Sequence, residues 1–184
     1  MTYPCLPPEV NSALMEAGAG SAPMRAASSA WSGLAGELRA AADSFGSVTS
    51  NLSGGTWQGA AAAAMAGAAA PYTAWLNAAA GHTEQAAAQA AAVAAAFEAA
   101  HAATVPTPVI AANRVLLGTL ANTNILGLNT PAIAATESHY EEMWAQDVTA
   151  MTNYHAGASS AWAGMAPLAP LREDVPKPVA TNNP

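Results

Sequence analysis

Residues 60–103 read AAAAAMAGAAAPYTAWLNAAAGHTEQAAAQAAAVAAAFEAAHAA, and this stretch decides the fold. Alanine is the strongest helix former and has one of the smallest side chains that pack. The stretch therefore predicts one long helix, about 65 Å at 1.5 Å per residue. Pro71 lies inside it and predicts a kink or the loss of one backbone hydrogen bond.

Charge is almost absent from this part of the chain. Between Asp43 and Glu137 only Glu84, Glu98 and Arg114 are charged. A helix that faces water normally has a charged stripe opposite its apolar one. The long helix also contains too many polar residues to face lipid. We therefore expect protein to cover most of its faces, including surface that a chain of 184 residues cannot cover alone.

Residues 22–52 predict a second long helix, with Ser21 as its expected N-cap. Its apolar residues recur at alternating steps of three and four, which is a heptad seam. The seam consists of Met24, Ala27, Trp31, Leu34, Leu38, Ala41, Phe45, Val48 and Leu52. Residues 54–59, GGTWQG, break this pattern and reverse the chain. A second stripe with the same period then runs from Met65 to Phe97.

Shorter helices are expected on either side of this hairpin. Pro8 opens a short first helix, and Thr107-Pro108 and Thr130-Pro131 open two later ones, the last reaching about Ala163. Clusters of Val, Ile and Thr, which favour strands, are absent from the sequence. The predicted fold is all-α, an elongated helical bundle built on a long antiparallel helical hairpin. We assign residues 1–165 to one domain and residues 166–184, which hold five prolines, to a disordered tail or linker.

The two apolar stripes allow two interpretations. They face each other within the hairpin, or they face a second helical hairpin that docks alongside and completes a four-helix bundle. The loop of residues 122–129 poses a similar question, because Ile125 and Leu126 lie in it and loops run over the surface. This pair either folds back onto the end of the hairpin or contacts another protein.

Several function classes find no support. The net charge of −7 argues against nucleic acid and anionic lipid as partners. His139 lies about 200° around a helix from Glu137, so the acidic residues near it predict a solvated face and no metal site. No catalytic or phosphate-binding motif is present, so we expect no enzyme, no cofactor and no small-molecule substrate. The N-terminus lacks the pattern of a conventional signal peptide.

Four motifs occur in an order that resembles the N-terminal domain of mycobacterial PPE proteins. They are Pro7-Pro8-Glu9, Trp57-Gln58-Gly59, the stretch NILGLNT at residues 124–130 and the stretch MWAQD at residues 143–147. The hairpin also resembles the wider WxG superfamily of type VII secretion substrates. The match covers about residues 1–165.

This resemblance implies a PE-family partner, whose two helices pack on the long hairpin as a four-helix bundle. Trp57 and Gly59 would lie beside the partner's secretion motif and help to form a composite export signal. We expect the partner to contact Pro7, Pro8, Met24, Trp31, Leu34, Leu38, Phe45, Trp57, Gly59, Met65, Tyr72 and Trp75.

The resemblance also implies a second contact. An EspG-type chaperone would grip the loop before the last helix in the cytosol. The chaperone-binding residues would be Asn124, Ile125, Leu126, Gly127 and Leu128. The predicted function is therefore a non-enzymatic secretion module, cytoplasmic before export by the type VII machinery and then secreted or associated with the cell envelope. The alternative is an envelope-associated transport or pore component that acts in nutrient uptake. An enzyme would need a domain beyond residue 165.

Overall fold

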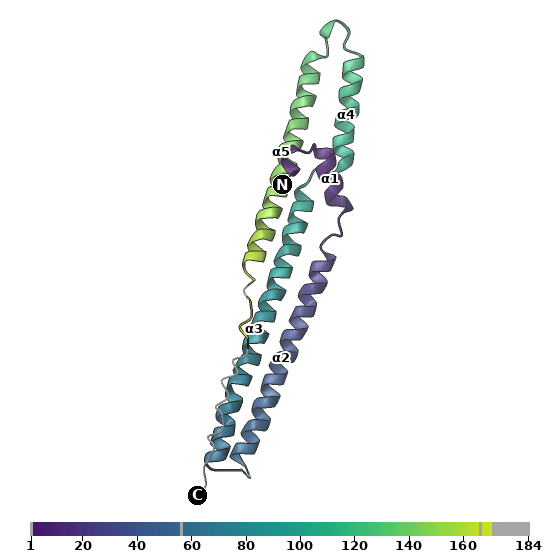
Figure 1. The fold of residues 1–184 in the computed structure, drawn as a ribbon. Helices are drawn as coiled ribbons and strands as arrows, with labels where there is room; N and C mark the ends of the chain where they lie inside the picture. Colours follow the sequence, from purple (N-terminus) through teal and green to yellow (C-terminus); the bar gives the residue numbers. More distant parts are fainter. Residues whose placement is uncertain (1, 56, 166, 171–184) are drawn as a thin grey trace. The chain divides into compact units, whose positions relative to one another are not determined.

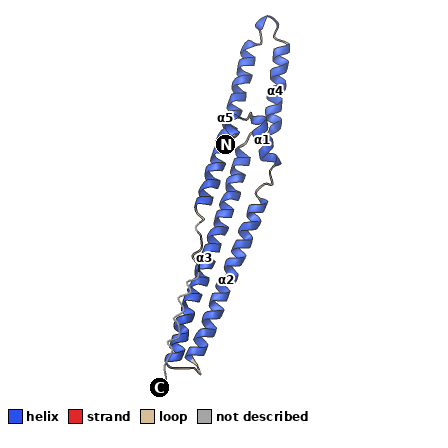
Figure 2. Cartoon of the chain, in the orientation of Figure 1, coloured by secondary structure: helices blue, strands red, loops and turns tan. Residues whose placement is uncertain are grey.

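The computed structural model describes residues 2–55, 57–165 and 167–170. Over these ranges the chain forms helices and no strand, as Figure 2 shows. The all-α fold class is therefore confirmed. The elements are η1 (Tyr3–Cys5), α1 (Pro8–Ala17), α2 (Ala22–Gly54), α3 (Ala60–Ala103), α4 (Thr107–Asn122), η2 (Ile125–Gly127) and α5 (Thr130–Ala163). Most of the predicted tail, residue 166 and residues 171–184, lies outside the described ranges.

The predicted helix starts and stops agree closely with the structure. The alanine-rich stretch forms α3 over its full predicted length and continues through Pro71. Pro108 and Pro131 each lie in the first turn of a helix, where the missing amide hydrogen of proline is no loss. The chain divides into two compact units, described separately below. Unit 1 comprises Met1–Ala26 and Gln89–Gly164, and unit 2 comprises Ala27–Ala88 and Met165–Pro184.

Unit 2 is built on the antiparallel pair of α2 and α3 (Figure 1). Small side chains close the seam between the two helices. Ala35 and Ala42 of α2 are fully buried, and so are Ala79 and Ala80 of α3. Leu76 is the one large buried residue among those that the structure describes in this unit. A methyl group fills little space, so the helix backbones approach closely. An exposed ion pair between Arg39 and Glu84 also joins the helices.

The two predicted apolar stripes face each other only in part inside the hairpin. Ala79 of the second stripe is buried and Phe45 meets Tyr72 across the two helices, whereas most large side chains of the first stripe stay exposed. Ala35 and Ala42 lie about 60° to 140° around α2 from Leu34, Phe45 and Val48, at 100° per residue. The buried alanines therefore leave those larger side chains pointing out of the seam, where all three are exposed. Side-chain size did not reveal the inward face, because the closest helix packing selects the smallest residues.

Unit 1 joins α1 to the α4–α5 pair, which lie side by side in Figure 1. Its apolar core consists of Val105, Ile110 and Met143, with Tyr140 packed against it. Asn11 of α1 is also fully buried. Its side-chain amide donates hydrogen bonds to the carbonyl oxygens of Tyr3 (3.2 Å) and Leu6 (3.1 Å), so it ties the N-terminal segment to α1.

Ser21 lies at the predicted N-cap position of α2, and its carbonyl oxygen accepts a hydrogen bond from the backbone amide of Arg25 at 3.0 Å. The hydroxyl of Ser21 donates a hydrogen bond to Glu98 Oε1 of α3 at 2.6 Å. Arg25 forms two hydrogen bonds with the same carboxylate, at 2.7 and 2.8 Å. These contacts, those of Arg25 above all, hold the pKa of Glu98 below its usual range. Ser21 therefore anchors α2 to α3.

None of the described helices combines the length and the hydropathy that crossing a bilayer requires.

Candidate functional site

The loop between α4 and α5 displays aliphatic side chains to solvent. We call residues 124–129 the tip. Ile125, Leu126 and Leu128 are 71%, 94% and 79% exposed, so they do not fold back onto the helices. Surface loops normally avoid such side chains in groups, and contiguous exposed apolar residues mark contact sites. The tip therefore has the composition of a protein-binding surface.

The tip backbone adopts a turn that most residues avoid. Leu126 has φ 57° and ψ 18°, and Gly127 follows it with φ 79°. A residue with a β-carbon in this left-handed region carries a strain of about 1 kcal/mol or more. Leu126 is the only non-glycine residue with positive φ in the part of the chain that the structure describes. Burial of its own side chain does not offset this strain, because that side chain is almost wholly exposed.

Two asparagines hold the turn together. The side-chain amide of Asn129 donates to the carbonyl oxygen of Leu120 at 3.1 Å and to Thr123 Oγ1 at 2.9 Å. The backbone amide of Asn129 donates to Asn124 Oδ1 at 2.8 Å. The last carbonyl groups of a helix have no hydrogen-bond donor within the helix. Asn129 supplies a donor for one of these carbonyl groups of α4, that of Leu120. The exposed tip is therefore an ordered structure.

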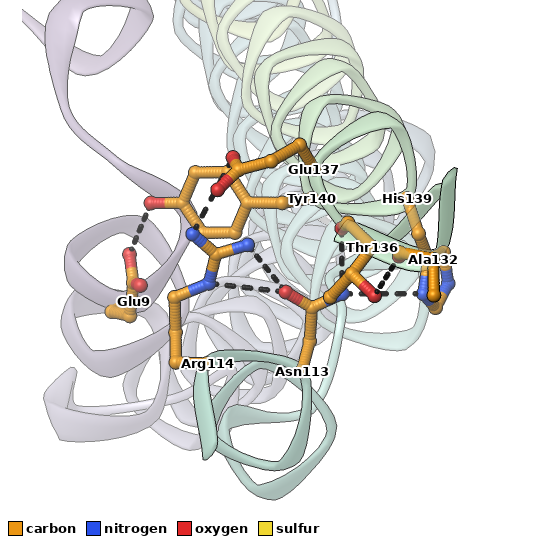
Figure 3. Close-up of polar contacts among 8 residues, drawn as sticks. All are labelled: Glu9, Asn113, Arg114, Ala132, Thr136, Glu137, His139 and Tyr140. Atoms are coloured by element: carbon orange, nitrogen blue, oxygen red, sulfur yellow. Dashed lines mark hydrogen bonds and ion pairs between the residues drawn. The ribbon is translucent and has the colours of Figure 1, made fainter. Parts of the chain in front are cut away.

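A polar cluster on α1, α4 and α5 supports the two helices that carry the tip (Figure 3). Tyr140 donates a hydrogen bond to Glu9 Oε2 of α1 at 2.9 Å. The guanidinium carbon of Arg114 lies 3.6 Å from the centre of the Tyr140 ring, a cation–π contact, and 3.8 Å separates the side chains of Arg114 and Glu137 in an ion pair. These contacts join three helices through one tyrosine and one arginine.

Asn113 lies beside this cluster and is buried. Its amide donates to the carbonyl oxygen of Thr136 at 3.0 Å, and its Oδ1 accepts from Arg114 Nε at 3.0 Å. His139 Nδ1 lies 3.5 Å from the same amide. The contacts of this cluster therefore hold α1, α4 and α5 together. The described residues contain no group of three His, Cys, Asp or Glu side chains placed to hold a metal ion.

Tyr140 gives the cluster a pH dependence at alkaline pH. Burial, together with the hydrogen bond to Glu9, raises the pKa of Tyr140 to about 12. The pKa of an unfolded tyrosine is about 10. The stability contributed by neutral Tyr140 is therefore fully present below pH 10 and falls as the pH rises from about 10 to 12. We expect Tyr140→Phe to remove this part of the pH dependence and to cost about 1 kcal/mol near pH 7.

Urea unfolding of both proteins at pH 7, 9 and 11.5 measures this effect. The difference in free energy of unfolding between wild type and Tyr140→Phe should shrink at pH 11.5. A difference that stays constant over the three pH values would contradict the role of Tyr140.

A second group of contacts in unit 1, between α1, α5 and the residues that precede α4, centres on a buried carboxylate that the sequence patterns did not reveal. Asp147 of α5 is fully buried. Its Oδ1 accepts from the backbone amide of Val105 at 2.8 Å, and its Oδ2 accepts from Ser12 Oγ at 2.9 Å. Spacing offered a signal, because Asp147 lies four and seven residues after Met143 and Tyr140. Those intervals place all three side chains on one helix face.

Unit 2 carries the other candidate surface. We call it the apolar face, and it is defined by the exposed side chains Trp31, Leu34, Phe45, Val48, Leu52 and Tyr72. Phe45 and Tyr72 meet edge to face, with ring centres 4.9 Å apart, so the face continues from α2 to α3. Trp75 stacks on Tyr72 at 6.4 Å. No residue of this set carries a charge. The apolar face therefore has the composition of a surface that contacts another protein.

The remaining residues predicted to contact a partner differ in exposure. Trp57 and Gly59 lie in the α2–α3 turn and are exposed. Leu38 and Met65 are half-buried, and Trp75 Nε1 donates to the carbonyl oxygen of Ala169 at 3.2 Å. In unit 1, Met24 is exposed and Pro7 is half-buried, whereas Pro8 is fully buried and offers no side-chain surface to a partner.

A shallow groove of about 420 Å³ runs along another side of the α2–α3 pair. Its lining consists of small and polar residues, namely Gly46, Thr49, Ser50, Ser53, Ala66, Ala69, Ala70, Thr73, Ala74 and Asn77. Ser50 and Val48 lie about 200° apart around α2 at 100° per residue. The two sides of the hairpin therefore differ in character, one aromatic and aliphatic, the other small and hydroxylated.

The chain is similar to known proteins over most of its length. The family model described as "PPE family" matches residues 2–166. Three uncharacterized PPE family proteins of Mycobacterium tuberculosis are similar to the chain. PPE42 is 56% identical over 91% of this chain and 29% of its own length, PPE12 is 59% identical over 92% and 26%, and PPE62 is 58% identical over 96% and 30%.

The chain thus spans less than a third of the length of these relatives. The match extends through the hairpin, the tip, the polar cluster around Tyr140 and the contacts of Asp147. This chain therefore belongs to the PPE family.

Proposed function

We propose that the chain is a secretion module that pairs with a PE-family protein through the apolar face of unit 2. The observation that carries this proposal is the separation of two kinds of side chain on α2. The alanines Ala35 and Ala42 close the hairpin, and Phe45 and Val48 are left exposed. A heptad seam whose large side chains stay mostly exposed in the chain suits a docked helical hairpin, because helices associate through such seams.

The tip supports a second contact, with an EspG-type chaperone in the cytosol. Ile125, Leu126 and Leu128 offer three exposed aliphatic anchors on a hydrogen-bonded turn. Anchors of this kind bind well when they enter a pocket that excludes water. The chaperone would cover the tip until the module reaches the type VII secretion machinery. Trp57 and Gly59, exposed in the turn of unit 2, would complete the export signal beside the PE partner.

Co-expression with and without PE proteins tests the pairing. We expect the chain to be insoluble or aggregated alone and soluble as a one-to-one complex with a matching PE protein. A monomeric, soluble chain with a sharp thermal transition in the absence of a partner would contradict the proposal.

A pair of matched variants identifies the surface that the partner covers. Val48→Arg places a charge on the apolar face, where Val48 is 57% exposed, and Ser50→Arg places the same charge in the groove. We expect Val48→Arg to weaken PE binding by about tenfold, because a buried unpaired charge is costly. Ser50→Arg should leave it unchanged. The affinity is measured by titration of the PE protein, and the reverse pattern would place the partner in the groove.

A further inference from the structure

We propose that Asn129 is a positioning residue, which holds the tip in the left-handed turn that presents Leu126 to a binding partner. This inference rests on the proposed function of the tip as a chaperone-docking surface. It adds a residue that does not itself provide an apolar anchor. Asn129 is half-buried behind the exposed aliphatic side chains.

The first step concerns the conformation of Leu126. Its φ of 57° belongs to a region that residues with a β-carbon rarely adopt, and its side chain is 94% exposed. The apolar side chain therefore contributes no packing that would keep the backbone there. Other groups must stabilise the turn, and they must act through hydrogen bonds, because the tip contains no buried side chain.

The second step concerns where the hydrogen bonds of Asn129 go. Asn129 precedes the first residue of α5, a position where asparagine normally accepts a hydrogen bond from the first turn of its own helix. Here its side chain makes no such cap bond. Both side-chain hydrogens are instead donated to the end of α4. Their acceptors are the carbonyl oxygen of Leu120 and Oγ1 of Thr123, the residue that follows the helix. The side chain thus bridges the two ends of the tip.

The third step concerns the closure of the loop. The backbone amide of Asn129 donates to Asn124 Oδ1, and Thr123 Oγ1 donates in turn to the carbonyl oxygen of Thr119 at 2.8 Å. Residues 124 and 129 are thereby joined directly across the exposed aliphatic residues. A closed loop of six residues leaves the backbone of Leu126 few alternatives. The tip is therefore preorganised, and a partner that binds it does not have to order it.

The substitution Asn129→Asp tests this role, because it keeps the shape of the side chain and removes both donor hydrogens. An aspartate at this position also suits the start of α5, so the helix itself should not be weakened. The matched control is Asn122→Asp. It introduces the same charge at an exposed residue that ends α4, and no hydrogen bond of its side chain is lost.

Two readouts separate positioning from general stability. The first is NMR of the chain in its soluble form, alone or with a PE protein. A left-handed Leu126 shows a short distance between its own amide and α hydrogens. The second is the affinity for a purified EspG-type chaperone. This chaperone is chosen from a panel because it retains the wild-type chain in a pull-down. We expect Asn129→Asp to lose the NMR signature and to bind about tenfold more weakly, mainly through faster dissociation.

Asn122→Asp should match the wild type in both readouts. Thermal unfolding should be similar for the wild type and Asn129→Asp, whereas the charge at the C-terminal end of α4 should lower the unfolding temperature of Asn122→Asp slightly. Thr123→Val removes one of the two acceptors of the Asn129 amide, together with the hydrogen bond from Thr123 Oγ1 to the carbonyl oxygen of Thr119, and should give an intermediate effect. An unchanged NMR signature or an unchanged affinity in Asn129→Asp would overturn the inference. If no chaperone in the panel retains the wild-type chain, the proposed function fails, and the NMR readout still decides whether Asn129 holds the turn.

Discussion

Leu126→Arg should abolish binding of an EspG-type chaperone, with a loss in affinity of at least about a hundredfold, and should leave the PE complex intact. Leu126 is the most exposed aliphatic residue of the tip and belongs to unit 1. A chaperone pocket that accepts leucine would have to bury an unpaired guanidinium group. Because the wild-type side chain makes no packing contact that the substitution could break, the fold of the chain should be unaffected.

Val115→Arg is the matched control for this prediction. Val115 is an aliphatic residue of α4 with an exposure of 70%, and it lies outside the tip. The same change there should reduce chaperone binding only slightly. Affinity is measured by calorimetry or surface plasmon resonance, and PE binding by co-purification. Loss of both partners in Leu126→Arg, or of neither, would contradict the assignment of the tip.

Asp147→Ala should lower the free energy of unfolding by about 3 kcal/mol. The carboxylate of Asp147 is fully buried and accepts the backbone amide hydrogen of Val105. Ser12 Oγ lies 2.9 Å from Asp147 Oδ2 and 2.8 Å from the carbonyl oxygen of Val105, so one hydroxyl hydrogen serves two acceptors. Alanine leaves the buried amide of Val105 without a partner and creates a cavity between α1, α5 and the connection that precedes α4.

Asp147→Asn provides the comparison. Its Oδ1 can still accept from Val105, and its amide can donate to Ser12 Oγ, which is then free to donate to the carbonyl oxygen of Val105. We expect its stability to lie within about 1 kcal/mol of the wild type. Denaturant unfolding followed by circular dichroism measures both variants. If asparagine costs as much as alanine, hydrogen-bond matching does not explain the burial of Asp147.

The helices of this chain could be predicted from sequence because their signals are local. Alanine content determined α3, and Pro108 and Pro131 marked the starts of α4 and α5. The side of each helix that packs was less accessible. The hairpin buries Ala35 and Ala42 rather than the neighbouring large residues, and in α5 the buried set includes Asp147 rather than a purely apolar stripe. In both cases close packing and hydrogen bonding outweighed hydrophobicity.

The tip shows the same limit at a finer scale. The exposed position of Ile125 and Leu126 was one of two interpretations of the sequence, and their exposure in the structure decides between them. The left-handed turn at Leu126 had no local signal, since leucine does not favour it. It depends on Asn129 reaching the carbonyl oxygen of Leu120, nine residues earlier in the chain. Such interactions across a loop are visible only in three dimensions.

The alanine seam of unit 2 has a consequence for the cell. A buried methyl group contributes roughly 1 kcal/mol, so a hairpin closed mainly by methyl groups gains little free energy from its own interior. A chain paired with a PE-family protein, as proposed above, would acquire much of its stability by mass action from that partner. We therefore expect orphan copies to be degraded by cellular proteases while paired copies survive. Such selective turnover would balance the amounts of the two subunits without any dedicated control of their synthesis.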